Sequence, residues 1–377
     1  MRVLHLLDSL NRGGAETLAL DVCRNARAAG LDLTFAATGG GELEDDFRSS
    51  GAHFVRLSRR APLDLRLAGQ LRRLIRERAV EVVHCHQAVE ALHAYLATRG
   101  DRRVKRVLSF HLCTADTKNR LALKFLAPRM DANVAVSRDL LACLDAEGGF
   151  ATAKNFHVVY NGVDAARLRR TATATGAGRL RLELKLTEGD LLLGMIGNFY
   201  ADARKDQLTI CRALPVLFRR APHAHFAFAG GHTGEGATRI YQECVDYCRE
   251  QGITDRVHFL GRRADVADVL GALDIFVFSS RKDSFGVAVV EAMLAGVPAV
   301  VSDIGALLEV TKGGEYASVF RTGDADDLAR RLCELVEDRA RRVRLAEVAR
   351  RWAAAEFGIE THIANLLKLY KSPASMP

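Results

Sequence analysis

Long apolar runs are missing from this sequence of 377 residues. No run approaches the roughly 18–20 residues that a membrane-spanning helix needs. The segment from Met1 to Leu10 is too short for a signal peptide and, at Asp8, too polar. Paired zinc-binding motifs are missing as well, since the 8 cysteines are scattered and only Cys244 and Cys248 lie close together. We therefore predict a cytoplasmic protein with reduced thiols and no zinc site.

What the sequence does contain is enough apolar material for two cores. Hydrophobic residues make up 49% of the chain, and its length suits about two domains. Short runs of β-branched and aromatic residues alternate with longer helical stretches, which indicates an α/β fold with buried parallel strands. The predicted strands are 2–7, 33–37, 53–57, 80–84, 104–111, 132–137, 157–160, 191–196, 225–229, 257–260, 275–278 and 298–302.

The stretch 274–303 organises the rest of the chain. Ile275 to Phe278 is a wholly apolar run typical of a buried strand, and a polar loop follows it. A helical segment opens at Gly286 and stops at Gly296, and the second strand begins at Pro298. In such a βαβ unit, ligands bind beyond the carboxyl ends of the strands, beside helix N-termini.

The residue types in this stretch predict a phosphorylated, hydroxyl-rich ligand. Backbone N–H groups near Phe285, Gly286 and Val287 lie at the positive end of a helix dipole and suit a phosphate. Asp283 lies in the loop, and Glu291 lies five residues into the helix, about 7–8 Å further along its axis. The two carboxylates can accept hydrogen bonds from sugar hydroxyls at either end of a diphosphate.

A simpler interpretation is that Asp283 only caps the helix and that Glu291 is a solvated helix residue. The neighbours of Glu291 argue against it, because Val289, Val290, Ala292 and Met293 leave no polar face. A lone carboxylate on a buried helix needs a partner.

The same stretch resembles a known family. Asp283, seven intervening residues and Glu291, with Ser-Phe-Gly, Glu-Ala-Met and Gly-Val-Pro in register, resemble the Glu-x7-Glu block of retaining GT-B glycosyltransferases, particularly glycosyltransferase family 4. One departure is that Asp283 stands where the family usually has Glu. The resemblance implies an α/β fold of two Rossmann-like domains that face each other across a cleft. It also implies sugar transfer from a nucleoside-diphosphate sugar with retention, without a metal, a cofactor or a covalent enzyme intermediate.

The resemblance divides the chain into four segments. Residues 1–165 are expected to form an acceptor-side domain, 166–189 a linker without hydrophobic periodicity, and 190–350 the nucleotide-sugar domain. Residues 351–377 are expected to form a final helix that crosses back to the first domain.

The resemblance also assigns site residues. Lys205 matches the cation that holds the donor diphosphate, and His111, at a strand end, matches the histidine that contacts the donor sugar. Glu291 is expected to hold the ribose and Asp283 the sugar. Asn198 stands where the family usually has Arg, and the neighbouring cation Arg204 is the candidate to compensate. The expected catalytic residues are His111, Lys205, Asp283 and Glu291, and the expected donor-binding residues are Gly14, Asn198, Arg204, Gly231, Arg262, Ser284, Phe285, Gly286 and Val287.

Two short motifs could indicate metal sites. His84 and His86 form a His-x-His motif at a strand end, where the family often has histidine as pocket lining. Asp324 and Asp326 spell Asp-x-Asp, but they follow Gly323 and precede a helical segment, so we interpret Asp324 as a helix N-cap. We therefore predict no metal.

Arginines gather between Arg56 and Arg78, and the net charge is +8. A solvated helix face is one interpretation, and an anionic membrane surface or acceptor is another. Nucleic acid is not expected, because no aromatic residues interleave with these charges. We expect a lipid-linked saccharide as the acceptor, on the cytoplasmic face of a membrane, in polysaccharide or glycolipid synthesis. An epimerase or phosphorylase of the same scaffold, or a catalytically silent nucleotide-binding protein, are the alternatives.

Overall fold

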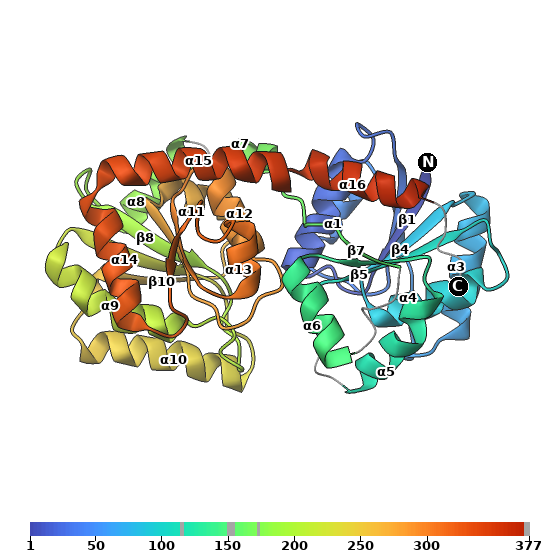
Figure 1. Cartoon of the computed structure of the whole chain (residues 1–377), viewed down its shortest axis with the longest axis horizontal. Coiled ribbons are helices and arrows are strands. Elements are labelled where there is room, and N and C mark those ends of the chain that lie inside the picture. The colour runs from blue at the N-terminus through green and yellow to red at the C-terminus, as the bar shows by residue number, and fades with distance from the viewer. Residues whose placement is uncertain (114–116, 149–154, 172–173, 373–377) are drawn as a thin grey trace. The chain divides into compact units, whose positions relative to one another are not determined.

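The computed structural model describes residues 1–113, 117–148, 155–171 and 174–372. Its contacts divide the chain into two compact units (Figure 1). Unit 1 comprises Met1–Val163 together with Phe357–Pro377, and unit 2 comprises Asp164–Glu356. The described helices include none that is long and apolar enough to cross a bilayer.

Unit 1 contains a parallel sheet of seven strands in the order β3-β2-β1-β4-β5-β6-β7. The strands are β1 (Arg2–Leu7), β2 (Asp32–Ala37), β3 (His53–Arg56), β4 (Val82–Cys85), β5 (Lys105–Phe110), β6 (Ala132–Ala135) and β7 (Phe156–Val158). The helices are α1 (Gly14–Asn25), α2 (Glu44–Arg48), α3 (Leu65–Glu77), α4 (Ala88–Thr98), α5 (Thr117–Leu126), α6 (Arg138–Gly148) and α16 (Ile359–Lys371). The strand order reverses between β1 and β4, which makes their carboxyl ends the expected ligand position.

Local sequence explains these elements. The strands of unit 1 are short apolar runs that are buried in the sheet, as Val3 and Leu4 of β1 are. Helix α3 buries one face and exposes the other, and the Asp64 carboxylate caps it by accepting the N–H groups of Arg66 and Leu67. Helix α16 packs beside α1 and adds Ile359 to the same core, so helices from the start and from the end of the sequence lie side by side (Figure 1).

Unit 2 repeats this plan with a parallel sheet of six strands in the order β10-β9-β8-β11-β12-β13. The strands are β8 (Leu191–Ile196), β9 (Ala224–Ala229), β10 (Val257–Gly261), β11 (Ile275–Phe278), β12 (Ala299–Ser302) and β13 (Ser318–Phe320). The helices are α7 (Ala165–Thr171), α8 (Ala174–Glu183), α9 (Gln207–Arg220), α10 (Glu235–Glu250), α11 (Val266–Ala272), α12 (Val287–Leu294), α13 (Gly305–Val310), α14 (Ala325–Glu337) and α15 (Arg339–Phe357). The strand order reverses between β8 and β11.

The two sheets confirm the predicted α/β class, and each predicted strand forms with ends within a few residues. Strand β13 was missed, because its three residues are too few to show a period. The segment that was expected to be a linker without hydrophobic periodicity contains two helices, α7 and α8. These helices pack on α11, and this tertiary contact stabilises segments whose own sequence has weak helical periodicity.

The prediction of reduced thiols is wrong for one pair. Cys113, just after β5, is bonded to Cys143 on α6, and their Cα atoms lie 6.1 Å apart. No local pattern predicts this bond, because the two residues are separated by 30 positions and only the fold brings them together. The other six cysteines are free and buried.

Candidate functional site

Lys205 lies in the loop after β8 and points at the carboxyl end of β11. Its ammonium group forms an ion pair with the Asp283 carboxylate and lies 4.4 Å from the centre of the Phe278 ring. Its backbone pairs with that of Ser280 in an isolated bridge. The fold therefore brings together the two oppositely charged residues that the sequence predicted for one site.

Asp283 also organises the start of α12. Its Oδ1 accepts the backbone N–H groups of Ser284, Phe285 and Gly286 at 2.8, 3.2 and 3.1 Å. Burial alone would raise the pKa of Asp283, but the charge of Lys205 and these hydrogen bonds hold the pKa below its ordinary value. Two of the N–H groups expected to bind phosphate are thus held by a carboxylate in this structure. Val287 follows them as the first residue of the helix.

Gly286 allows the chain to turn into α12. Its φ is +87°, in the left-handed region that other residues rarely adopt. A Cβ at this position would also lie 2.5 Å from Cδ2 of Leu307. Both constraints favour glycine at the helix start.

Glu291 lies on the buried face of α12 with a partner that the sequence did not suggest. It is 8% exposed, and Nη2 of Arg167 donates to its Oε1 at 2.8 Å. Arg167 lies on α7, inside the segment predicted to be a linker. The pair explains how an anionic side chain is tolerated among apolar neighbours.

The loop after β8 meets the loop after β9. The Gly231 N–H donates to Oδ1 of Asn198 at 2.9 Å, and a Cβ on Gly231 would lie 3.5 Å from Nε of Arg262. These three predicted residues therefore lie together. Arg204 does not join them as a spare cation, because its guanidinium is paired with Asp202 at 2.8 Å.

In unit 1 histidines lie at the carboxyl ends of β4 and β5. Gly14 is the first residue of α1, after β1. His111 follows β5, and its Nε2 lies 3.0 Å from Nδ1 of His86. Burial lowers the pKa of His111 to about 4, so its ring is neutral at neutral pH. The predicted histidine thus lies beside a second, deeper histidine at the carboxyl end of β4.

Sequence profiles match both units. Residues 12–167 match the profile described as Glycosyltransferase Family 4, and residues 190–338 match Glycosyl transferases group 1. The chain belongs to glycosyltransferase family 4. It is therefore a glycosyltransferase that moves a sugar from a nucleoside-diphosphate sugar, as the motif in α12 predicted.

Characterised relatives of this family 4 chain differ in their named products. It is 26% identical to N-acetyl-alpha-D-glucosaminyl L-malate synthase of Bacillus anthracis over 316 residues, which cover 82% of this chain and 79% of the relative. It is 27% identical to the lipopolysaccharide core biosynthesis mannosyltransferase LpsB of Rhizobium meliloti, over 78% of this chain and 80% of the relative.

Solved structures share the GT-B fold. The HepE protein of Anabaena, in complex with UDP and glucose, aligns with a TM-score of 0.84 at 21% identity and covers 99% of this chain and 100% of its own. A glycosyltransferase of Rickettsia africae aligns with a TM-score of 0.84 at 15% identity, over 98% and 97% of the two chains. These likenesses confirm the predicted GT-B class of the glycosyltransferase.

The Asp-x-Asp motif of the glycosyltransferase caps a helix, as predicted. Asp324 is the N-cap of α14, and its Oδ1 accepts the Asp327 N–H at 2.9 Å. Residues that the sequence did not single out include Arg167 and, in unit 1, Tyr370, whose hydroxyl lies 2.6 Å from Nδ1 of His84. Neither carries a local signal, because each acts on a residue far away in the chain.

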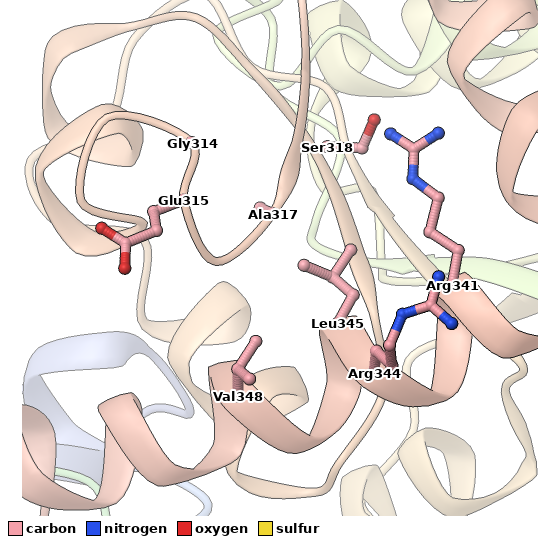
Figure 2. Close-up of a pocket in the computed structure, with 8 residues that line it drawn as sticks. All are labelled: Gly314, Glu315, Ala317, Ser318, Arg341, Arg344, Leu345 and Val348. Atoms are coloured by element: carbon pink, nitrogen blue, oxygen red, sulfur yellow. The ribbon is translucent and has the colours of Figure 1, made fainter.

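A pocket of about 310 Å³ opens elsewhere on unit 2, between the loop before β13 and α15 (Figure 2). Ser318 and Arg341 lie toward one end of it, and Glu315 and Val348 lie toward the other (Figure 2). Its lining comprises Gly314, Glu315, Ala317, Ser318, Arg341, Arg344, Leu345 and Val348. None of the predicted site residues lines it.

Proposed function

We propose that this family 4 enzyme transfers a hexose, with retention, from a nucleoside-diphosphate sugar to a lipid-linked saccharide at a membrane surface. The donor half rests on the ion-paired residues of unit 2. Lys205 would hold the diphosphate as charge develops on the leaving group, together with the start of α12 at Gly286. The Lys205 ammonium would have to be shared between Asp283 and the diphosphate, and Asp283 would also contact the sugar.

Glu291 would hold the ribose hydroxyls while Arg167 donates to the carboxylate and fixes its orientation. Asn198 and Gly231 would line the nucleoside, with Arg262 beside them. A uridine-diphosphate sugar is the first donor to test, because HepE of Anabaena has been solved with UDP and with UDP-glucose. His111 would contact the transferred sugar from unit 1.

The observation that carries the acceptor half is a surface at the start of α3. Leu63 and Leu65 are 58% and 72% exposed, and they lie in sequence between Arg60 and Arg66, whose side chains are also exposed. These two arginines form no ion pair among the described residues. Exposed leucines flanked by free cations fit the interface of an anionic bilayer, where each basic residue contributes about 1 kcal/mol.

Other arginines of the cluster are already engaged and contribute less. Arg59 pairs with Asp8, Arg73 with Glu77, and Arg78 with Asp32. We therefore assign membrane binding only to the exposed arginines of the cluster that form no ion pair among the described residues.

Vesicle co-sedimentation tests the acceptor half. The wild type should bind vesicles that contain anionic lipid and should dissociate from them at high salt, because salt screens the attraction. Reversing Arg60 and Arg66 to Glu should weaken binding at least tenfold, from about 1 kcal/mol per basic residue. Arg239 and Arg249 on α10 are exposed, so reversing both gives a control with the same charge change. If the wild type bound neutral and anionic vesicles equally, or if the control variant lost as much vesicle binding, a soluble acceptor would be favoured over a lipid-linked one.

Measuring the nucleoside diphosphate released from UDP-glucose, GDP-mannose and ADP-glucose, with and without lipid-linked acceptor, tests the donor half. Release that depends on acceptor supports transfer. Conversion of the donor to an epimer without net release would support an epimerase, and phosphate-dependent release would support a phosphorylase.

A further inference from the structure

A continuous chain of hydrogen bonds crosses the carboxyl ends of β1, β4 and β5 in unit 1. It links side chains from these strands and from α16, and we name it the histidine chain. In order, it runs through Ser109, His84, Tyr370, His5, His86 and His111.

Every link has hydrogen-bond length. Nε2 of His84 lies 2.7 Å from Oγ of Ser109, and its Nδ1 lies 2.6 Å from the Tyr370 hydroxyl. The same hydroxyl lies 3.1 Å from Nε2 of His5, whose Nδ1 lies 3.1 Å from Nε2 of His86. The final link, from His86 to His111, is 3.0 Å.

All members of the chain are neutral at neutral pH. Burial lowers the pKa of His5 to about 3 and that of His111 to about 4, and it holds the pKa of His84 and of His86 well below the ordinary value. Each member therefore carries a single mobile proton, since a neutral imidazole has one N–H and a hydroxyl has one O–H. His362 lies beside the chain, and its Nδ1 is 2.6 Å from the carbonyl oxygen of Tyr160.

Six single-proton groups joined by five links have only two arrangements in which every link holds one proton and the buried Tyr370 hydroxyl donates to one of its two neighbours. If two neighbours point their protons at one link, they clash, and if both point away, the link has no proton. All protons must therefore point toward His111, or all must point toward Ser109. In the first arrangement His111 accepts at Nε2 and carries its proton on Nδ1, and in the second it carries its proton on Nε2.

Ser109 selects between the two. Ser109 is 5% exposed, and the only hydrogen-bond partner of its hydroxyl among the described residues is Nε2 of His84. Pointing the proton away from His84 would leave a buried O–H without an acceptor, which is unfavourable. The favoured direction therefore runs from Ser109 to His111.

We propose that Ser109, His84, Tyr370, His5 and His86 are positioning residues that fix the tautomer of His111, so that its Nδ1–H is the hydrogen-bond donor offered to an oxygen of the transferred sugar. This rests on the proposed function only in its last clause. The fixed tautomer itself is a property of the free enzyme.

The three deepest histidines could also suggest a metal ion, since one ring nitrogen from each of His5, His84 and His86 lies within 4.8 Å of the other two. Both nitrogens of each ring are already joined to another side chain. A metal would have to displace a hydrogen bond at every one of the three. The hydrogen-bonded chain gives every one of these six nitrogens a partner, whereas a metal would bind only one nitrogen of each ring. We therefore favour the hydrogen-bonded chain.

The test is a spectrum of the enzyme labelled with ¹⁵N-histidine, without substrate, because ¹⁵N shifts distinguish a protonated ring nitrogen from an unprotonated one. His111→Gln identifies the signals. The wild type should show His111 with a proton on Nδ1 alone. Tyr370→Phe cuts the chain in the middle, and Ser109→Ala removes the hydroxyl that sets its direction, so both should show a mixture of the two tautomers.

Kinetics provide the second measurement. A mixture leaves only part of the enzyme with the correct donor, so kcat should fall between two- and tenfold in both variants while KM for the donor stays within twofold. Tyr95→Phe is the matched control, because it removes a hydroxyl from unit 1 that belongs to no link of the chain. It should leave the tautomer and kcat unchanged, and the thermal midpoint shows that each variant is folded.

Three results would overturn the proposal: an Nε2–H tautomer or a mixture in the wild type, a tautomer unchanged in both variants, or purified enzyme with one equivalent of zinc on these rings. If the spectra agree but wild-type enzyme releases no nucleotide from any donor, the histidine chain stands and the proposed function fails.

Discussion

The two units bury polar groups at the same point of similar sheets, but they differ in charge. At the reversal of strand order in unit 2, Lys205 pairs with Asp283, and Arg167 pairs with Glu291 on α12 nearby. At the reversal in unit 1, the buried groups are uncharged imidazoles and hydroxyls. Buried ions need partners, whereas neutral groups need only complete hydrogen bonding.

The difference matches the ligands expected in a family 4 enzyme. A diphosphate is strongly anionic and benefits from a fixed cation such as Lys205. A transferred sugar is uncharged and is read by the direction of hydrogen bonds, which a neutral histidine can fix. We therefore expect changes of charge to matter most in unit 2, and changes of proton direction to matter most in unit 1.

The largest effect is expected for Lys205→Ala. The variant lacks the cation, and the unpaired charge of Asp283 would repel the diphosphate. We therefore expect kcat/KM to fall roughly a hundredfold, which is typical when one preorganised electrostatic group is removed. Stability should fall by about 3 kcal/mol, because a buried carboxylate loses its partner. Nucleotide release and urea unfolding measure the two effects.

The double variant Lys205→Ala/Asp283→Asn separates activity from stability. The double variant removes both charges from this position of unit 2, so no buried carboxylate is left without a partner. Stability should therefore largely return, while activity should stay low because the cation is still missing. Lys312→Ala breaks an exposed pair with Glu315 and serves as the control. Wild-type activity in folded Lys205→Ala would show that the cation has no role in donor binding.

The next effect is expected for Glu291→Gln, which keeps the shape of the side chain and removes its charge. We expect kcat/KM to fall about tenfold, because hydrogen bonds from hydroxyls to a charged acceptor are roughly twice as strong as those to a neutral one. A double-mutant cycle with Arg167→Met should give a coupling free energy of about 1–3 kcal/mol. Additive effects of the two substitutions would mean that the 2.8 Å contact carries no energy.

Local patterns predicted much of unit 2. The apolar run of β11, the glycine at the start of α12 and the spacing from Asp283 to Glu291 are all visible within one short stretch. Such patterns work because strand burial and helix capping depend on neighbours in sequence. Lys205 could be assigned because it matched a family motif.

The partners of these residues could not be predicted in the same way. Arg167 is 124 positions from Glu291, and Tyr370 is 286 positions from His84. Contacts over such separations are set by how helices pack on the sheets, and a single sequence leaves no periodic trace of them. The Cys113–Cys143 bond escaped prediction for the same reason.

That bond provides the third prediction, since it cross-links unit 1 and the described cysteines of unit 2 are free. Cys143→Ser should lower the stability of unit 1 by about 3–4 kcal/mol, the amount expected for closing a loop across 30 positions. Hydrogen exchange followed by mass spectrometry should show faster exchange in unit 1 and little change in unit 2. Reductant should reproduce the effect in the wild type and add nothing to Cys143→Ser. Equal exchange in both proteins would show that the bond does not stabilise unit 1.

The smallest effect concerns a carboxyl group that unit 1 keeps neutral. Glu90 on α4 is 1% exposed, and neither of its carboxylate oxygens has a hydrogen-bond partner among the described residues. Burial, with a contribution from the charge of Asp8, raises the pKa of Glu90 to about 7. This is the opposite of Asp283 in unit 2, whose pKa is lowered by its cation.

The sign of the pH dependence follows. A carboxyl group whose pKa is higher in the folded state favours folding while it is protonated, so its contribution is complete below its unfolded pKa and is lost as pH rises through about 7. Glu90→Gln is neutral at every pH and should lose nothing. Thermal unfolding of both proteins should be measured between pH 5 and 8. As pH rises, the free energy of unfolding of the variant should increase relative to that of the wild type, by about 3 kcal/mol at most. Glu315→Gln, an exposed change, should track the wild type. Parallel curves for Glu90→Gln and wild type would mean that Glu90 is charged when folded, and that unit 1 tolerates a buried charge as unit 2 does.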